Sequence, residues 1–147
     1  MIGTKTYGGF LMSQIRHLGG RVGEKLLKQS GVDVFNGAQG RILYVLWERE
    51  TLTITQIGRL TSLAKTTLTG MLDRMEAGGL VERIPDKKNR RQILITVTEK
   101  AKSYREKYDW ISDRTNEIFY RGFTDEEITG FENQLRRILS NLENEGV

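Results

Sequence analysis

The chain has 147 residues, of which 37% are hydrophobic and 29% charged, and this length and composition fit one globular domain. It contains no cysteine and a single histidine, His17, which excludes a disulfide framework, a thiol nucleophile or redox switch, and thiolate or multi-histidine metal sites. The longest apolar run, Ile42–Trp47, is far shorter than the ~18–20 residues of a membrane span. The opening MIGTKTYGG lacks the apolar core of a secretory signal, so we expect a soluble cytoplasmic protein.

The net charge of +4 is unevenly distributed. Residues 1–52 carry seven Lys/Arg and four Asp/Glu, residues 53–105 carry eleven and five, and residues 106–147 carry five and ten. A basic middle followed by an acidic end indicates a polyanion-binding segment, although composition alone fits a solvated charged surface equally well.

In chain order, the first predicted element is an amphipathic helix from about Gly8 to Lys28. Asn36 with Gln39, and then Thr53 with Gln56, have the spacing of capping boxes and predict the starts of a second and a short third helix. A fourth helix, Lys65–Ala77, has an apolar face and ends at Gly78-Gly79. The apolar face of the first predicted helix, the stripe on which its prediction rests, consists of Leu11, Ile15, Leu18, Val22 and Leu26.

The rest of the chain predicts a hairpin and two long helices. Leu80–Ile84 and Gln92–Val97 are rich in β-branched residues and flank the polar segment PDKKNRR, which predicts a two-stranded hairpin. Thr98 is expected to cap one long helix running through Ile118. Thr124 with Glu127 predicts the capping box of a last helix with an apolar stripe.

The predicted fold is therefore mainly α with a small β-hairpin: a helix-turn-helix followed by a hairpin and flanked by helices from both chain ends. The outward face of the fourth helix combines short hydrogen-bonding side chains with cations and fits a major groove ~12 Å wide. We expect DNA contacts from Lys65, Thr66, Thr67, Thr69 and Arg74.

The hairpin loop supplies a second candidate contact. Lys87, Lys88, Arg90 and Arg91 crowd beside a single acid, Asp86, and this mutual repulsion favours a polyanion as partner. An arginine at such a tip can enter a narrow minor groove, which attracts cations. The alternative is an ordinary solvated turn.

TQIGRLTSLAKTTLTGMLDRMEAGGLVER, followed by DKKNRR and LITVTEKA, resembles the MarR family of winged-helix transcription regulators over residues 36–101. The resemblance implies that Lys65, Thr66, Thr67 and Thr69 face the major groove. It also implies that Arg91 enters the minor groove while Arg90 and Lys88 contact phosphates. Three positions depart from the family pattern: Asn89 replaces an aspartate that orients the loop arginine, Ala64 a capping serine, and Gly70 a larger polar residue.

By the same resemblance, residues 1–35 and 98–147 contribute helices to a homodimer around a DNA-binding region at 36–97. The alternative is that the apolar stripe of the last helix packs within its own chain. A two-fold dimer predicts a pseudo-palindromic operator. The family suggests a repressor controlled by a small-molecule effector, which the sequence does not identify.

The two alternative classes of function are an enzyme and a protein-interaction module. An enzyme is disfavoured because the only carboxylate cluster, Asp125-Glu126-Glu127, occupies a predicted helix N-terminus, where acids stabilise the dipole. We therefore predict no catalytic residue, metal or cofactor. The second alternative is a winged-helix protein-interaction module or helical adaptor, which the loop charges disfavour because protein interfaces need apolar anchors.

Overall fold

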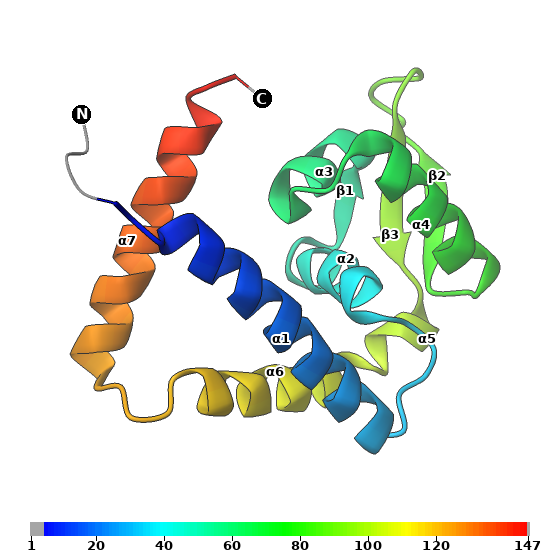
Figure 1. Ribbon diagram of the computed structural model, residues 1–147. Coiled ribbons are helices and arrows are strands. Elements are labelled where there is room, and N and C mark those ends of the chain that lie inside the picture. The colour runs from blue at the N-terminus through cyan, green and yellow to red at the C-terminus, as the bar shows by residue number, and fades with distance from the viewer. Residues whose placement is uncertain (1–4, 147) are drawn as a thin grey trace. The chain divides into compact units, whose positions relative to one another are not determined.

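The computed structural model describes residues 5–146, so residues 1–4 and 147 of the predicted terminal regions lie outside the described residues. The chain divides into two compact units, which meet between Asp113 and Arg114. The described elements, in chain order, are α1 Gly8–Gln29, α2 Gly37–Arg49, β1 Thr51–Thr53, α3 Ile54–Thr61, α4 Lys65–Ala77, β2 Val81–Pro85, β3 Ile93–Val97, α5 Glu99–Lys102, α6 Arg105–Phe119 and α7 Asp125–Glu143 (Figure 1).

Three helices begin at the predicted capping boxes. At the start of α3, the Thr53 hydroxyl accepts from the Gln56 backbone N–H at 3.1 Å, and the Gln56 side chain accepts in return at 2.9 Å. The same reciprocal pair opens α2 at Asn36 and α7 at Thr124. The three predicted helix starts are therefore confirmed. Each box satisfies two backbone N–H donors that would otherwise lack partners.

The sheet has three strands rather than the two predicted. Its order is β1-β3-β2, with antiparallel pairs on both sides of β3. The two predicted strands are found: the first is shifted by one residue to β2, and the second is shortened by one residue to β3. The prediction missed β1 because three residues are too short to show an alternating pattern, and because Thr53 also caps α3.

The single long helix predicted after Thr98 is wrong, because two helices, α5 and α6, occupy this stretch. Thr98 does cap the first of them by accepting from the Ala101 N–H. The Ala101 carbonyl then accepts from Tyr104 N–H and from the buried Trp47 Nε1, and the Ser103 hydroxyl donates to the Lys100 carbonyl at 2.6 Å. These bonds replace the regular helical ladder and interrupt the helix.

The core of the first unit is built around α2. Ile42, Leu43 and Leu46 are fully buried, and apolar residues of α3, α4 and the sheet pack around them. Gly40 permits close packing, since a Cβ atom there would lie 2.8 Å from Tyr108 Cε2. The other residues with 2% exposure or less are Ile57, Leu68, Leu72, Met75, Leu80, Val81, Ile95 and Ala101.

Much of the apolar surface of α1 lies outside this core. Of its predicted stripe, Leu26 is buried and Val22 is half-buried, whereas Leu11, Ile15 and Leu18 are exposed. None of the helices within residues 5–146 combines the length and apolar character needed to cross a bilayer.

In the second unit, aromatic side chains cluster where α6 gives way to α7. Tyr120 stacks edge-on against Phe119, Phe123 and Phe131, and its hydroxyl donates to Glu132 Oε2 at 2.7 Å. Burial and this hydrogen bond raise the pKa of Tyr120 above its ordinary value. No residue of α7 is buried in the single chain.

Gly40→Ala tests the close packing of α2. The added methyl must displace the Tyr108 and Phe35 rings, at a cost of ~1–3 kcal/mol that exceeds the helix-propensity gain of up to ~1 kcal/mol. We expect a lower free energy of unfolding in urea. Gly130→Ala in α7, where nothing lies within 4 Å, is the matched control and should leave stability unchanged or raised. Equal effects of the two variants would contradict this packing.

Candidate nucleic-acid interface

The fourth helix is held against the core by one face. Leu68, Leu72 and Met75 of α4 are at most 1% exposed. Between α3 and α4 the chain turns at Ser62, which has a left-handed backbone with φ of 56°. This helix-turn-helix arrangement leaves the opposite face of α4 open to solvent (Figure 1).

The predicted contact residues of α4 lie on or beside this open face. Lys65, Thr66, Thr67 and Arg74 are exposed, while Thr69 is half-buried. The Thr69 hydroxyl donates to the Lys65 carbonyl at 2.9 Å. Within the described residues, the hydroxyls of Thr66 and Thr67 have no hydrogen-bond partner, so they are free to contact a ligand.

The beginning of α4 has the features expected from its sequence. Ala64 occupies the N-cap position with an extended backbone and provides no side-chain cap. Gly70 has open space above it, since the nearest atom to a Cβ placed there would be Arg74 Nη1 at 3.9 Å. The first turn therefore offers uncapped N–H groups beside Lys65, a combination that suits an anion.

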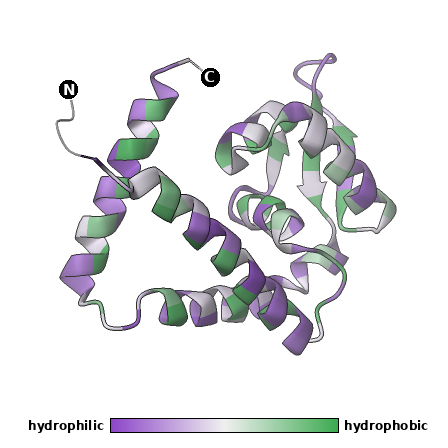
Figure 2. Cartoon of the chain, in the orientation of Figure 1, coloured by the Kyte–Doolittle hydropathy of each residue, from purple (hydrophilic) through white to green (hydrophobic). Residues whose placement is uncertain are grey.

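The loop between β2 and β3, residues 86–92, is shaped by its own side chains. Asp86 Oδ1 accepts from the Lys88 N–H at 2.9 Å, and Asn89 Oδ1 accepts from the Arg91 N–H at 3.2 Å. Asn89 thus holds the backbone of Arg91, whereas the resemblance suggested that this position orients the arginine side chain. The four cationic side chains of the loop are exposed, and the loop is uniformly hydrophilic (Figure 2).

The cations of residues 53–105 separate into two groups. Arg83, Lys102 and Arg105 form ion pairs, and Lys100 donates to the Gly78 carbonyl. The others have no carboxylate within 4.0 Å and no side-chain hydrogen bond among the described residues. These unpaired cations are Arg59, Lys65, Arg74, Lys87, Lys88, Arg90 and Arg91, all on α3, α4 or the loop.

Sequence reasoning missed Arg83, a β2 residue whose guanidinium contacts α4. Its Nη2 lies 2.7 Å from Asp73 Oδ1, and its Nη1 lies 2.7 Å from Glu76 Oε1. Burial lowers the pKa of Arg83, but the two hydrogen bonds raise it more, so the net shift is upward. The acids stand three residues apart on one helix, a spacing that places both on one side, yet nothing in the sequence indicates that β2 faces them.

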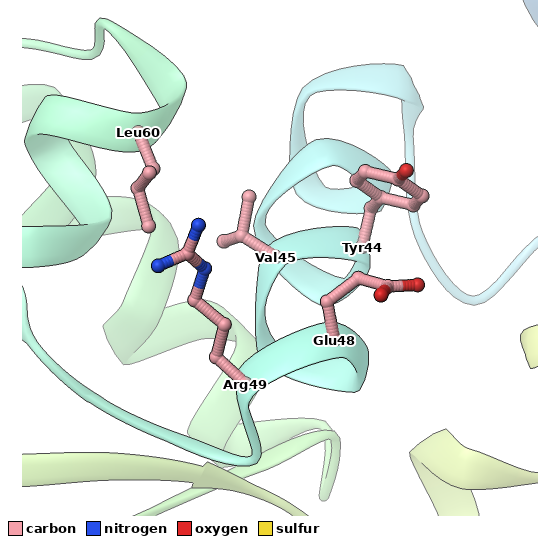
Figure 3. Close-up of a pocket in the computed structure, with 5 residues that line it drawn as sticks. All are labelled: Tyr44, Val45, Glu48, Arg49 and Leu60. Carbon is pink, nitrogen blue, oxygen red and sulfur yellow. The ribbon is translucent and has the colours of Figure 1, made fainter.

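A surface hollow of about 570 Å³ lies between α2 and α3. Figure 3 shows Val45 and Arg49 directed toward Leu60, with Tyr44 and Glu48 on another side of α2. Glu48 pairs with Arg105 at 2.7 Å. No pairing partner is found for Arg49 in the described part of the chain. Among residues 5–146, no group of three His, Cys, Asp or Glu side chains could hold a metal ion.

A helix-turn-helix whose second helix is followed by a β-hairpin with a cationic loop defines a winged-helix protein, and the β2–β3 hairpin is its wing. The MarR family model matches residues 35–93. Residues 35–93 therefore carry a MarR-family domain, as the sequence motifs suggested.

The named relatives agree with this assignment. The chain is 41% identical over 68 residues to the HTH-type transcriptional regulator TtmR of Methylorubrum extorquens (strain PA1), which covers 46% of the chain and 35% of the relative. It is 43% identical over 65 residues to the organic hydroperoxide resistance transcriptional regulator of Bacillus subtilis (strain 168), covering 44% of each. The chain thus matches less than half the length of these two relatives. Both are described as transcriptional regulators, in agreement with the prediction that the chain is not an enzyme.

The fold also matches that of a solved family member. A mutant MarR from E. coli complexed with operator DNA superposes with a TM-score of 0.80, covering 92% of this chain and 99% of that one at 22% identity. At this identity the likeness concerns the winged-helix fold, including the three-stranded sheet.

Ala64→Ser tests the uncapped start of α4. Because Ala64 already has the extended backbone of an N-cap, a serine hydroxyl can accept from the N–H of Thr66 or Thr67 and should stabilise the protein by ~0.5–2 kcal/mol. Urea unfolding measures the change. Ala64→Val, which offers no acceptor, is the control, and a serine variant no more stable than the valine variant would contradict the interpretation.

Proposed function

We propose that the protein is a transcriptional regulator that binds duplex DNA through α4 and the wing. The observation that carries the proposal is the clustering of unpaired cations on α3, α4 and the wing loop. Two of the nearby acids, Asp73 and Glu76, are paired with Arg83 and therefore do not neutralise these cations. A polyanion is the natural partner of such a surface.

The exposed face of α4 suits a major groove. Thr66 and Thr67 can each hydrogen-bond a base edge or pack a methyl group against thymine, and Lys65 can reach a phosphate or guanine. Since the Thr69 hydroxyl already donates to the Lys65 carbonyl, we expect Thr69 to contribute less to base readout than Thr66. The uncapped N–H groups of the first turn add a place for a phosphate.

The wing suits the adjoining minor groove. Its residues 86–92 are all polar or charged, which leaves no apolar anchor of the kind a protein-binding wing needs. Arg91, held at its backbone by Asn89, is the proposed minor-groove residue. Lys88 and Arg90 are the proposed phosphate contacts, and Arg74 extends the cationic surface along α4.

We further propose that two copies of the chain form a homodimer through the terminal helices. Burying exposed apolar side chains of α1 and α7 against a second copy would remove them from water. Two α4 helices related by a two-fold axis would read half-sites of a pseudo-palindromic operator about one helical turn apart. The exposed apolar residues are Tyr7, Phe10, Leu11, Met12, Ile15 and Leu18 on or just before α1, and Ile138, Leu139 and Leu142 on α7.

Occupation of an operator by such a dimer would block polymerase sterically, so repression is the proposed direction of control. An effector that favours another spacing of the two α4 helices would lower DNA affinity. Tyr44 lines the hollow of Figure 3, whereas Trp47 is buried and donates its indole N–H to the Ala101 carbonyl. A regulator of this kind would act in the cytoplasm.

Titration with duplexes selected from a random pool tests the proposal. Binding through ~6–10 phosphates should lose ~10³–10⁵ in affinity between ~50 and ~200 mM salt. Failure to bind any duplex in dilute buffer, or affinity independent of salt, would favour the protein-interaction module instead.

Arg91→Ala tests the wing assignment. Loss of the minor-groove arginine should weaken binding of the selected duplex by ~1–3 kcal/mol and reduce discrimination at flanking A·T pairs. Lys102→Ala is the matched control, because it removes a cation that is already paired with Glu99 on α5. Fluorescence anisotropy measures both, and equal losses would contradict a specific role for Arg91.

Phe10→Glu and Leu142→Glu test the homodimer. Each places a charge on an apolar position that is 67% or 58% exposed in the single chain, so the fold should persist while self-association weakens. Sedimentation velocity measures the mass, and circular dichroism the helix content. Gln14→Glu and Ser140→Glu, at exposed polar positions of the same helices, should remain dimeric. A monomeric unmodified chain would contradict the proposal directly.

A further inference from the structure

The contact between Arg83 and α4 joins two parts of the proposed DNA interface that are otherwise linked by the backbone and by apolar packing. The guanidinium spans two carboxylates one helical turn apart, with a separate nitrogen on each. Within residues 5–146, these are the only side-chain hydrogen bonds between α4 and the hairpin strands. The Arg83 side chain is 22% exposed, whereas the side chains of Asp73 and Glu76 are 63% and 43% exposed.

Ion pairs this exposed contribute little to the free energy of folding, typically ~0–1 kcal/mol. Their geometry, however, restrains the position of β2 relative to α4. We call the contact of Arg83 with Asp73 and Glu76 the brace. The planar guanidinium can satisfy two acceptors at once, which lysine cannot do with the same fixed geometry. Arg83 lies in the middle of β2, opposite Ile95 of β3, so both strands at the base of the wing are tied to the helix.

Because the brace lies near the base of the hairpin, it limits how far the loop can move relative to α4. Lys88 lies five residues beyond Arg83, a separation of at most roughly 17 Å at ~3.3 Å per residue. A tilt of the hairpin by roughly 10° about its base would move the loop by up to roughly 3 Å, enough to break a hydrogen bond in a groove.

We propose that Arg83 is a positioning residue, which fixes the wing relative to α4 so that both can enter neighbouring grooves, and that it does not itself contact DNA. The role in DNA binding rests on the proposed function, whereas the contact between Arg83 and α4 is present in the free protein. The competing interpretation is purely electrostatic: Arg83 would neutralise two carboxylates that otherwise repel phosphates.

The first test needs no DNA. The chain contains no cysteine, so Thr66→Cys/Lys88→Cys accepts two nitroxide labels, one on α4 and one on the loop. Diluting the labelled protein with excess unlabelled protein confines the measured distance to one chain. We expect the distance distribution from pulsed electron paramagnetic resonance to broaden with Arg83→Gln and equally with Asp73→Asn/Glu76→Gln. Unchanged distributions in both would overturn the proposal.

The second test uses the selected duplex and two variants whose charge changes are opposite. Arg83→Gln removes one positive charge, and Asp73→Asn/Glu76→Gln removes two negative charges. A brace predicts that both weaken binding by about tenfold, close to the loss of one groove contact, and that combining them adds little. The electrostatic interpretation predicts weaker binding for the first variant and tighter binding for the second, and that result would overturn the proposal.

Coupling to the wing distinguishes positioning from general destabilisation. Arg91→Ala should cost much less binding in the Arg83→Gln protein than in the unmodified one, because a displaced wing no longer delivers Arg91 to its groove. A full, additive cost would contradict the proposal. Lys102→Gln and Glu99→Gln break another exposed ion pair and are the controls; they should alter neither the label distances nor the affinity.

Thermal unfolding shows whether Arg83→Gln folds. If it does not, Arg83→Lys and the carboxylate variants take its place in both tests. If the unmodified protein binds no duplex, the proposed function fails, yet the label distances still decide whether Arg83 braces the wing. If duplex binding falls with Arg83→Gln while the distances stay unchanged, Arg83 acts through its charge or by direct contact with DNA, and the inference is wrong.

Discussion

The burial of one face of α4 is the interaction on which the rest of the interface depends. Leu68, Leu72 and Met75 recur at steps of four and three and pack into the core next to Ile57 of α3. Because successive residues of an α-helix are spaced 3.6 to a turn, this packing fixes the rotation of the helix about its axis. Lys65 and Thr66 then face outward, and a change of register would bury them. The same rotation brings Asp73 and Glu76 within reach of β2.

The distribution of ion pairs matters more to the interface than the net charge. Residues 53–105 are strongly basic, but the paired cations Lys102 and Arg105 sit on α5 and α6, where they bind acids of their own unit. Within residues 53–105, the cations left without partners lie on α3, α4 and the wing loop. Counting charges along the sequence indicated a basic segment, and only the three-dimensional pairing separates the cations that remain available to a ligand from those already satisfied.

Local signals in the sequence predicted much of the fold, whereas features that depend on residues distant in the sequence were not predicted. Capping boxes such as Thr53 with Gln56 involve atoms three residues apart and are readable from a short window. The break between α5 and α6 depends on Trp47, which is 54 residues from the carbonyl it contacts. The pairing of β1 with β3 likewise joins segments more than 40 residues apart. Apolar periodicity correctly predicted the helix α1 but not that most of its stripe would remain exposed in a single chain.

The candidate site shows the same division. The residue types and the order of α4 and the wing loop predicted which side chains would be exposed, but not that Thr69 would bond to the helix backbone or that Arg83 would join the two parts. Each proposed α4 helix presents few free groups to bases, and the open space at Gly70 removes one more. Since a base contact contributes ~1–3 kcal/mol of discrimination and specific binding requires ~4–10 kcal/mol, one such helix would fall short. A second copy, held by the apolar residues that one chain leaves exposed, and a wing kept in register would together make up the difference.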